Sequence, residues 1–204
     1  MSLNANYDGY PTSPQSGYAH TQPQGTHMAS NSKICKLKIS LSDIDRNHYD
    51  SLNLTVAQHP SETTERMMVR ILVFCINARE RLEFTKGLSA VDEPDIWARS
   101  LDDQLLLWID VGEPSTDRIK KASRIAKEVK VYSFNRKSSP WWEQGRDKFA
   151  QLKASFYRFE WQNIQSLAAL YQRTMQLSVT ITGNSAYVAT GLGECEVSWV
   201  PLQG

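Results

Sequence analysis

The chain has 204 residues, with 23 Lys and Arg against 22 Asp and Glu, so its formal net charge is +1. This length suffices for one domain with a substantial hydrophobic core. The near-neutral charge excludes a strongly basic protein, so binding to nucleic acid or to an anionic membrane would depend on local basic patches. No apolar run is long enough to cross a bilayer. We therefore expect a cytoplasmic protein without a membrane partner, and nothing in the sequence indicates an obligate protein partner.

The three cysteines, Cys35, Cys75 and Cys195, are far apart in the sequence and odd in number. Their spacing fits no metal-binding motif, and their neighbours have the apolar character of strand or helix cores. Reduced, buried thiols are typical of cytosolic proteins, so we expect all three to be free.

Residues 1–32 differ in composition from the rest of the chain. Pro, Gly, Ser, Tyr, Gln and Asn dominate there, and charged or aliphatic side chains are scarce, so no core can form. The segment lacks the positive start and apolar centre of a signal peptide. The run from His27 to Ser30 resembles a cloning junction. We interpret this leader as a disordered expression tag or linker, with a natural low-complexity tail as the alternative, and expect a single domain over residues 33–204.

Two strands and a helix are predicted at the start of this domain. Residues 33–42 and 52–56 alternate between apolar and polar side chains, which is typical of strands with one exposed face. Pro60 and Ser61 then indicate the start of a helix with Ser61 as its cap. The apolar stripe of this helix consists of Met68, Ile71, Leu72 and Cys75.

Two acidic residues lie in the first turns of the predicted helix. Glu65 comes three residues before Met68, which places it on the apolar stripe. A carboxylate there either pairs with a buried arginine or belongs to a functional site. Glu62 lies four residues before Arg66, and we expect these two side chains to form a surface ion pair.

A strand over residues 81–86 is followed by a hairpin with a turn at residues 101–104. Asp95 stands at the start of the first hairpin strand and Asp110 near the end of the second, which is apolar enough to be covered on both faces and therefore central. A carboxylate at the end of a buried strand is costly unless something pairs with it. With Lys120 and Lys121 just beyond, the two carboxylates would hold a divalent cation and polarise a phosphate. The alternative is a polar hairpin without a site.

The remaining chain alternates between helices and strands. A helix capped by Ser115 places Lys121 at the edge of its inner face and Lys120 further outward. Strands over residues 129–134 and 155–159 alternate with further helices, which is typical of right-handed crossovers in a parallel or mixed sheet. The last strands, over residues 175–182, 187–190 and 194–200, are expected to pair with the first strand as a second, small antiparallel sheet. The predicted fold class is therefore mixed α/β.

Several blocks of the sequence resemble the YaeQ family of bacterial proteins. These blocks are HPSETTERMMVRIL (59–72), GLSAVDEP (87–94), LWIDVGEP (107–114) and RIKKA (118–122). They occur in the right order, and the resemblance covers residues 33–204. It implies a fold similar to that of the PD-(D/E)XK nucleases, which is a restriction-endonuclease-like mixed sheet flanked by helices.

The resemblance also implies a metal site. In that superfamily an acidic residue on the first helix, an Asp after a Pro, and the acid of a (D/E)-x-K strand end bind one or two magnesium ions. On this sequence they match Glu65, Asp95 and Asp110. The neighbouring acids Asp92 and Glu93 are expected to share or replace the role of Asp95.

This chain has no lysine at the position that the (D/E)-x-K motif requires. That position falls on Gly112, and some superfamily members supply the lysine from the following helix, where this chain has Lys121 and Lys120. The implied function is a nuclease that depends on Mg²⁺ or Mn²⁺ and acts on DNA or RNA. Trp141 and Trp142 are then candidates for stacking on bases, with core packing as the alternative. The candidate phosphate contacts are Arg118, Arg124, Arg136 and Lys137.

Two other hypotheses stay open. The first is a non-catalytic binding or interaction module on the same fold, favoured by Gly112 and by the near-neutral charge. The second is a domain whose acids form structural ion pairs with Arg66, Arg70 or Arg81.

Overall fold

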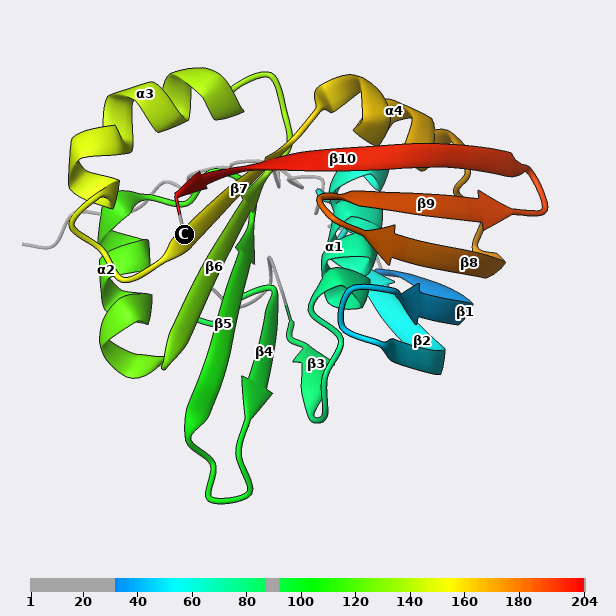
Figure 1. Cartoon of the computed structure of the whole chain (residues 1–204), viewed down its shortest axis with the longest axis horizontal. Helices are drawn as coiled ribbons and strands as arrows, with labels where there is room; N and C mark the ends of the chain where they lie inside the picture. The colour runs from blue at the N-terminus through cyan, green and yellow to red at the C-terminus, as the bar shows by residue number, and fades with distance from the viewer. Residues whose placement is uncertain (1–31, 87–91, 204) are drawn as a thin grey trace, which may run out of the picture.

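The computed structural model describes residues 32–86 and 92–203, and the predictions for the leader and for residues 87–91 lie outside this part. Within it, ten strands form one mixed sheet in the order β2-β1-β8-β9-β10-β7-β6-β5-β4-β3, and four helices pack against it (Figure 1). The strands are β1 (Lys33–Asp43), β2 (His48–Gln58), β3 (Leu82–Phe84), β4 (Ile96–Arg99), β5 (Leu105–Val111), β6 (Glu128–Ser133), β7 (Ser155–Phe159), β8 (Thr174–Thr182), β9 (Ser185–Thr190) and β10 (Gly193–Gln203). The helices are α1 (Thr64–Ile76), α2 (Thr116–Ile125), α3 (Ser138–Phe149) and α4 (Trp161–Ala169).

The predicted crossovers lie in one half of the sheet. Strands β5, β6 and β7 are parallel neighbours, and α2 and α3 connect them. Both helices pack on the same side of these strands, where Ile119 of α2 and Phe149 of α3 share a core with Trp108 of β5. The prediction that the second hairpin strand is central is confirmed, because β5 lies between β4 and β6.

The sheet curves around α1 and is nearly closed (Figure 1). Every residue of α1 from Met67 to Cys75 is buried, since strands from both halves of the sheet surround the helix. The same core contains apolar residues of β1, β5 and β8, and it also contains Ile164 and Leu167 of α4. A helix enclosed in this way is buried on all sides, Arg70 included, which a single apolar stripe does not predict.

The prediction that the last strands pair with the first strand is confirmed, but these strands do not form a separate antiparallel sheet. Strand β1 pairs in parallel with β8, and β10 joins the two halves into one sheet. The first part of β10, from Gly193 to Ser198, pairs with β9, and its last part, from Trp199 onward, pairs with β7. A strand of 11 residues is long enough for its two ends to pair with different strands. The alternation of apolar and polar residues indicates neither the pairing partner nor whether the pair is parallel. The likeness to restriction endonucleases stays a prediction.

Some boundaries also differ from the prediction. Thr63, and not Ser61, caps α1 by accepting a hydrogen bond from the backbone N–H of Arg66. Ser115 caps α2 as predicted. The cysteines are free, as expected. In the part of the chain that the structure describes, no helix is both long and apolar enough to span a membrane.

Candidate functional site

Asp95 and Asp110 meet at the open end of the hairpin formed by β4 and β5. Ile96 pairs with Ile109 in antiparallel register, so Asp95 lies opposite Asp110 one step further along. The backbone N–H of Asp95 continues the ladder by donating to the carbonyl of Ile109 at 2.9 Å. The two residues are only 4% and 3% exposed. The structure therefore brings together the two acids that the sequence singled out.

The carboxylate of Asp95 is bound by an arginine from α1. Arg66 Nη2 donates to both oxygens of Asp95, at 2.7 and 2.9 Å. The backbone N–H of Val111 also donates to Oδ2, at 2.8 Å. One guanidinium therefore connects α1 to the hairpin through charge-assisted hydrogen bonds.

Arg66 also binds a second buried acid, Glu62. Its Nη1 lies 2.8 Å from Glu62 Oε1, and Nη1 of Arg70 lies 3.0 Å from each oxygen of the same carboxylate. Burial lowers the pKa of Arg66, but the charges of Asp95 and Glu62 outweigh it and hold the pKa above its ordinary value. The pair of Glu62 with Arg66 was predicted correctly, but its placement on the surface was wrong, because Glu62 is 5% exposed.

The carboxylate of Asp110 is bound by a different arginine. Arg118 Nε and Nη2 donate to its two oxygens at 3.0 and 2.8 Å, and Trp108 Nε1 donates at 3.0 Å. Burial raises the pKa of Asp110, and the bonds from Arg118 only partly oppose this. Arg118 comes from α2, so the two aspartates receive their arginines from helices on opposite sides of the sheet.

Sequence reasoning missed the role of Arg118, which it assigned to a phosphate. A usable signal was present. Ser115 caps α2 only four residues after β5 ends at Val111, so the first turn of α2 must lie beside the end of β5. Arg118 is the cationic residue of that turn, and a buried carboxylate nearby requires such a partner.

Among the residues that the structure describes, no other predicted site residue binds the carboxylate of Asp95 or Asp110. Glu65 is half-buried, and neither Arg66 nor Arg70 binds it, so the alternative in which it pairs with a buried arginine is not found. Lys120 is exposed. Lys121 Nζ lies 2.6 Å from Asp92 Oδ1 in a pair whose side chains are 63% and 84% exposed.

The neighbouring acids do not complete a metal site either. The hydrogen bond from Lys121 lowers the pKa of Asp92, and the side chain of Glu93 accepts a long bond, 3.3 Å, from the backbone of Lys86. Over residues 32–86 and 92–203, no three His, Cys, Asp or Glu side chains are close enough to hold one cation. Mg²⁺ does not fit the arrangement of Asp95 and Asp110, because it would have to displace two guanidinium groups.

Trp142 belongs to the core beneath α3, and the half-buried Trp141 packs against this core. Their rings lie 4.8 and 5.6 Å from the ring of Phe149. The indole of Trp141 donates to the carbonyl of Pro114 at 3.0 Å. The alternative of core packing is therefore correct.

Comparison with known proteins gives consistent results for sequence and structure. The family model described as "YaeQ protein" matches residues 28–199. "Uncharacterized protein YaeQ" of Escherichia coli (strain K12) is 38% identical over 178 residues, which cover 86% of this chain and 98% of that protein. The protein of the same name from Salmonella typhi is equally similar, at 38% identity over 178 residues.

Two crystal structures have a closely similar fold. The YaeQ protein from Xanthomonas axonopodis pv. citri superposes with a TM-score of 0.82 at 34% identity, over 85% of this chain and 99% of that one. The YaeQ protein from Pseudomonas syringae gives a TM-score of 0.81 at 34% identity, over 85% and 97% of the two chains. This chain belongs to the YaeQ family.

Proposed function

We propose that this protein is a non-catalytic binding module, and that its buried acids serve the fold instead of a reaction. The observation that supports this proposal is the pairing of Asp95 with Arg66, through one nitrogen, and the bidentate pairing of Asp110 with Arg118. We call this network the hairpin cluster; its members are Glu62, Arg66, Arg70, Asp95, Asp110 and Arg118.

The hairpin cluster connects two helices to the hairpin of β4 and β5. Arg66 holds α1 to the end of β4, and Arg118 holds α2 to the end of β5. A buried charge without a partner costs several kcal/mol, so each arginine makes it possible for an aspartate to lie in the interior. A network in which every carboxylate already has a cationic partner supports a structural role for these acids.

The backbone at Gly112 also supports the proposal. This residue occupies the lysine position of the nuclease motif, and its φ is +115°. Side chains with a Cβ rarely adopt such a conformation. The next residue, Glu113, is held by Asn135 Nδ2 at 2.6 Å and Ser138 Oγ at 2.8 Å. The chain therefore turns sharply at the point where a lysine-bearing strand would have to continue.

A second candidate is the nuclease that the resemblance implies, with a restriction-endonuclease-like fold, Mg²⁺ or Mn²⁺ as cofactor, and DNA or RNA as substrate. The register that sets Asp95 opposite Asp110 favours it. Two observations argue against a nuclease: arginines already bind both acids, and Lys120 and Lys121 are exposed.

Calorimetric titration of Mg²⁺ and Mn²⁺ tests the proposal. The parent is compared with a variant carrying Asp95→Asn and Asp110→Asn, and with a control carrying Asp102→Asn and Asp103→Asn in the exposed turn. We expect the three proteins to give the same weak or absent heat. Binding that the parent and the control share and the double aspartate variant lacks would overturn the non-catalytic proposal and support the nuclease.

A further inference from the structure

One surface of the molecule combines little charge with many hydrogen-bonding groups. It is formed by the outward side chains of four adjacent strands, β2, β1, β8 and β9. In β1 and β8 the alternate residues face the core around α1 and are buried, so the outward set is exposed or half-buried. We call this set the outer face; its main members are Tyr49, Ser51, Asn53, Thr55, Lys36, Lys38, Ser40, Ser42, Thr174, Gln176, Ser178, Thr180, Ser185, Tyr187 and Ala189.

The positive charge of the outer face lies on β1, away from the acids at its β10 border. Lys36 and Lys38 of β1 are the charged members of the set just named, and neither forms an ion pair with any residue that the structure describes. The adjoining acids are Glu194 and Glu196 on the next strand, β10. Three strand spacings separate β10 from β1, which amounts to roughly 14 Å. This isolation makes the two lysines available to an anionic partner.

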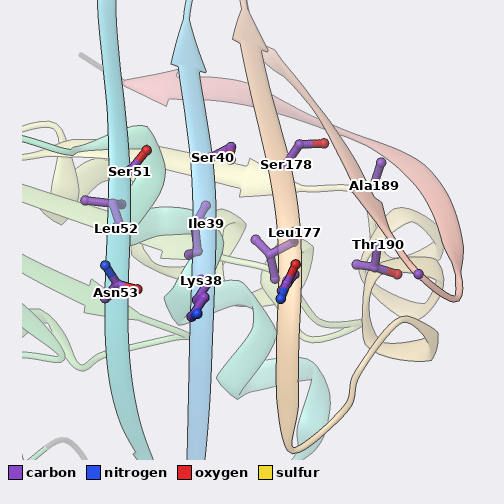
Figure 2. Close-up of a pocket in the computed structure, with 12 residues that line it drawn as sticks. Lys38, Ile39, Ser40, Ser51, Leu52, Asn53, Leu177, Ser178, Ala189 and Thr190 are labelled. Atoms are coloured by element: carbon purple, nitrogen blue, oxygen red, sulfur yellow. The ribbon is translucent and has the colours of Figure 1, made fainter.

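A shallow hollow of about 630 Å³ crosses the strands of this face. Its floor is a row of small side chains in register, in which Ser40 pairs with Ser51 on one side and Ser178 on the other, and Ser178 pairs with Ala189. Figure 2 shows these residues side by side across the four strands. The hollow exists because four neighbouring strands place a small side chain at the same level.

The two sides of the hollow have different chemistry. On one side, Lys38 stands between Asn53 and Gln176. On the other side, Tyr49 of β2 and Tyr187 of β9 lie at the two ends of one row, and they are 60% and 43% exposed. The hydroxyl of Tyr187 donates to Glu194, a contact that raises its pKa. Two exposed aromatic rings therefore border a polar hollow beside an unpaired cation.

We propose that the outer face binds single-stranded RNA. The lysines would contact phosphates, and the tyrosines would stack on two bases, since base–aromatic stacking tolerates any sequence. A sheet face with exposed aromatic rings is a known way to bind unpaired RNA bases. The Ser, Thr, Asn and Gln side chains match the ribose 2′-hydroxyl, which both donates and accepts hydrogen bonds and favours RNA over DNA. This inference names a partner and a surface beyond the proposed function, and it does not depend on the hairpin cluster.

Fluorescence anisotropy of a labelled 12-nucleotide oligo(U) tests the inference. The full chain is titrated in EDTA, so that no metal-dependent event at the hairpin contributes. We expect affinity to fall linearly on a logarithmic salt scale, with a slope of about 0.7 for each phosphate contact. Absence of binding at low salt would overturn the proposal. Equal or tighter binding of oligo(dT), or of duplex RNA, would overturn the assignment to single-stranded RNA.

Variants locate the binding surface. Lys36→Ala with Lys38→Ala is expected to reduce the salt slope by about 1.4, and Tyr49→Ala to weaken affinity by at least about fivefold. Lys153→Ala, which removes an exposed lysine from the loop between α3 and β7, is the matched control and should leave affinity unchanged. Outer-face variants that bind like the parent would overturn the proposal.

Chemical-shift mapping with ¹⁵N-labelled protein gives an independent result. Oligo(U) should shift the amide signals of the hollow, from Ser40, Ser51 and Ser178. Shifts confined to residues near Asp95 and Arg118 would overturn the inference, because they would show that RNA binds at the hairpin cluster. The metal titration reports on the hairpin alone, so the failure of either proposal can be recognised separately.

Discussion

The hairpin cluster and the outer face differ in how their charged side chains are placed: in the cluster they are paired, and on the outer face they are not paired with any residue that the structure describes. In the cluster, Asp95 and Asp110 are almost fully buried and each has its own arginine. On the outer face, Lys36 and Lys38 are exposed and form no ion pair with a described residue. The cluster uses its charges to join elements of the fold, whereas the lysines of the outer face remain available to a partner.

This contrast shows that unusual residues do not by themselves indicate a binding site. Asp95 and Asp110 attract attention because acids at the ends of apolar strands are costly. Their arginines explain why they are tolerated. The serines of β1, β2 and β8 are ordinary strand residues, and they form the floor of a hollow only because the sheet aligns them in one row.

The largest effect is expected when the cluster loses a shared cation. Arg66→Met leaves the carboxylates of Asp95 and Glu62 buried without their bonds to Arg66, and we expect the free energy of unfolding to fall by about 3–5 kcal/mol. Urea denaturation measures the change. Arg79→Met is the matched control, since Arg79 pairs with Glu128 near the surface, and it should cost about 1 kcal/mol or less. Equal losses for both variants would show that the cluster is not a special element of the fold.

A smaller effect and a defined pH dependence are expected for Asp110→Asn. Because the folded pKa of Asp110 lies above the ordinary 3.8, the folded state retains this proton at pH values where the unfolded chain has released it. The stabilising contribution of Asp110 is therefore complete below pH 3.8 and is lost as the pH rises through the folded pKa. At pH 7 the variant should differ from the parent by only about 1 kcal/mol or less, since a buried ion pair is often no better than a neutral replacement.

Thermal denaturation of the parent and the Asn variant between pH 4 and pH 7 checks this sign. The parent should lose stability relative to the variant as the pH rises. If the parent instead became more stable relative to the variant over the same range, the hydrogen bonds from Arg118 would outweigh the cost of burying the carboxylate of Asp110.

One substitution would neutralise the charge of Lys38 on the outer face, as acids and arginines neutralise each other in the hairpin cluster. Gln176 is the register partner of Lys38, so Gln176→Glu places an acid beside that lysine with little change in shape. We expect affinity for oligo(U) to fall about two- to fivefold, with the free energy of unfolding unchanged within about 0.5 kcal/mol. Gln176→Lys is the matched control and should strengthen binding. Anisotropy measures both, and weaker binding by the Lys variant would contradict an electrostatic role for this row.

The smallest effect is expected for Lys121→Ala. The pair of Lys121 with Asp92 is largely exposed, so the melting temperature should not change measurably. The pKa of Asp92, which Lys121 lowers, should return toward its ordinary value in an NMR titration. A clear loss of thermal stability would contradict the assignment of this pair to the surface.

Local patterns in the sequence predicted most elements of the fold. Alternation identified the strands, Ser115 identified the start of α2, and the apolar run before Asp110 identified a central strand. These features depend on neighbouring residues only, so they can be read without the tertiary structure. The parallel direction of the β1–β8 pair and the pairing of β10 with β7 were not predicted, because pairing is decided between segments that are far apart in the sequence.

The candidate site was predicted in part for the same reason. Asp95 and Asp110 were singled out because the cost of burying a carboxylate follows from its position on an apolar strand. The register of the hairpin then placed them opposite each other. Their partners were harder to identify, since Arg66 and Arg118 reach them from helices on opposite sides of the sheet.

The sequence by itself determined the family, the mixed α/β class, and the presence of two buried acids that required compensation. Only the tertiary structure decided that arginines supply this compensation, and that the helical lysines Lys120 and Lys121 do not. It also decided that the small residues of β1, β2, β8 and β9 line up into one hollow. Hydrophobicity and charge are properties of each residue, whereas an ion pair or a row across strands requires groups that meet only when distant segments pack together.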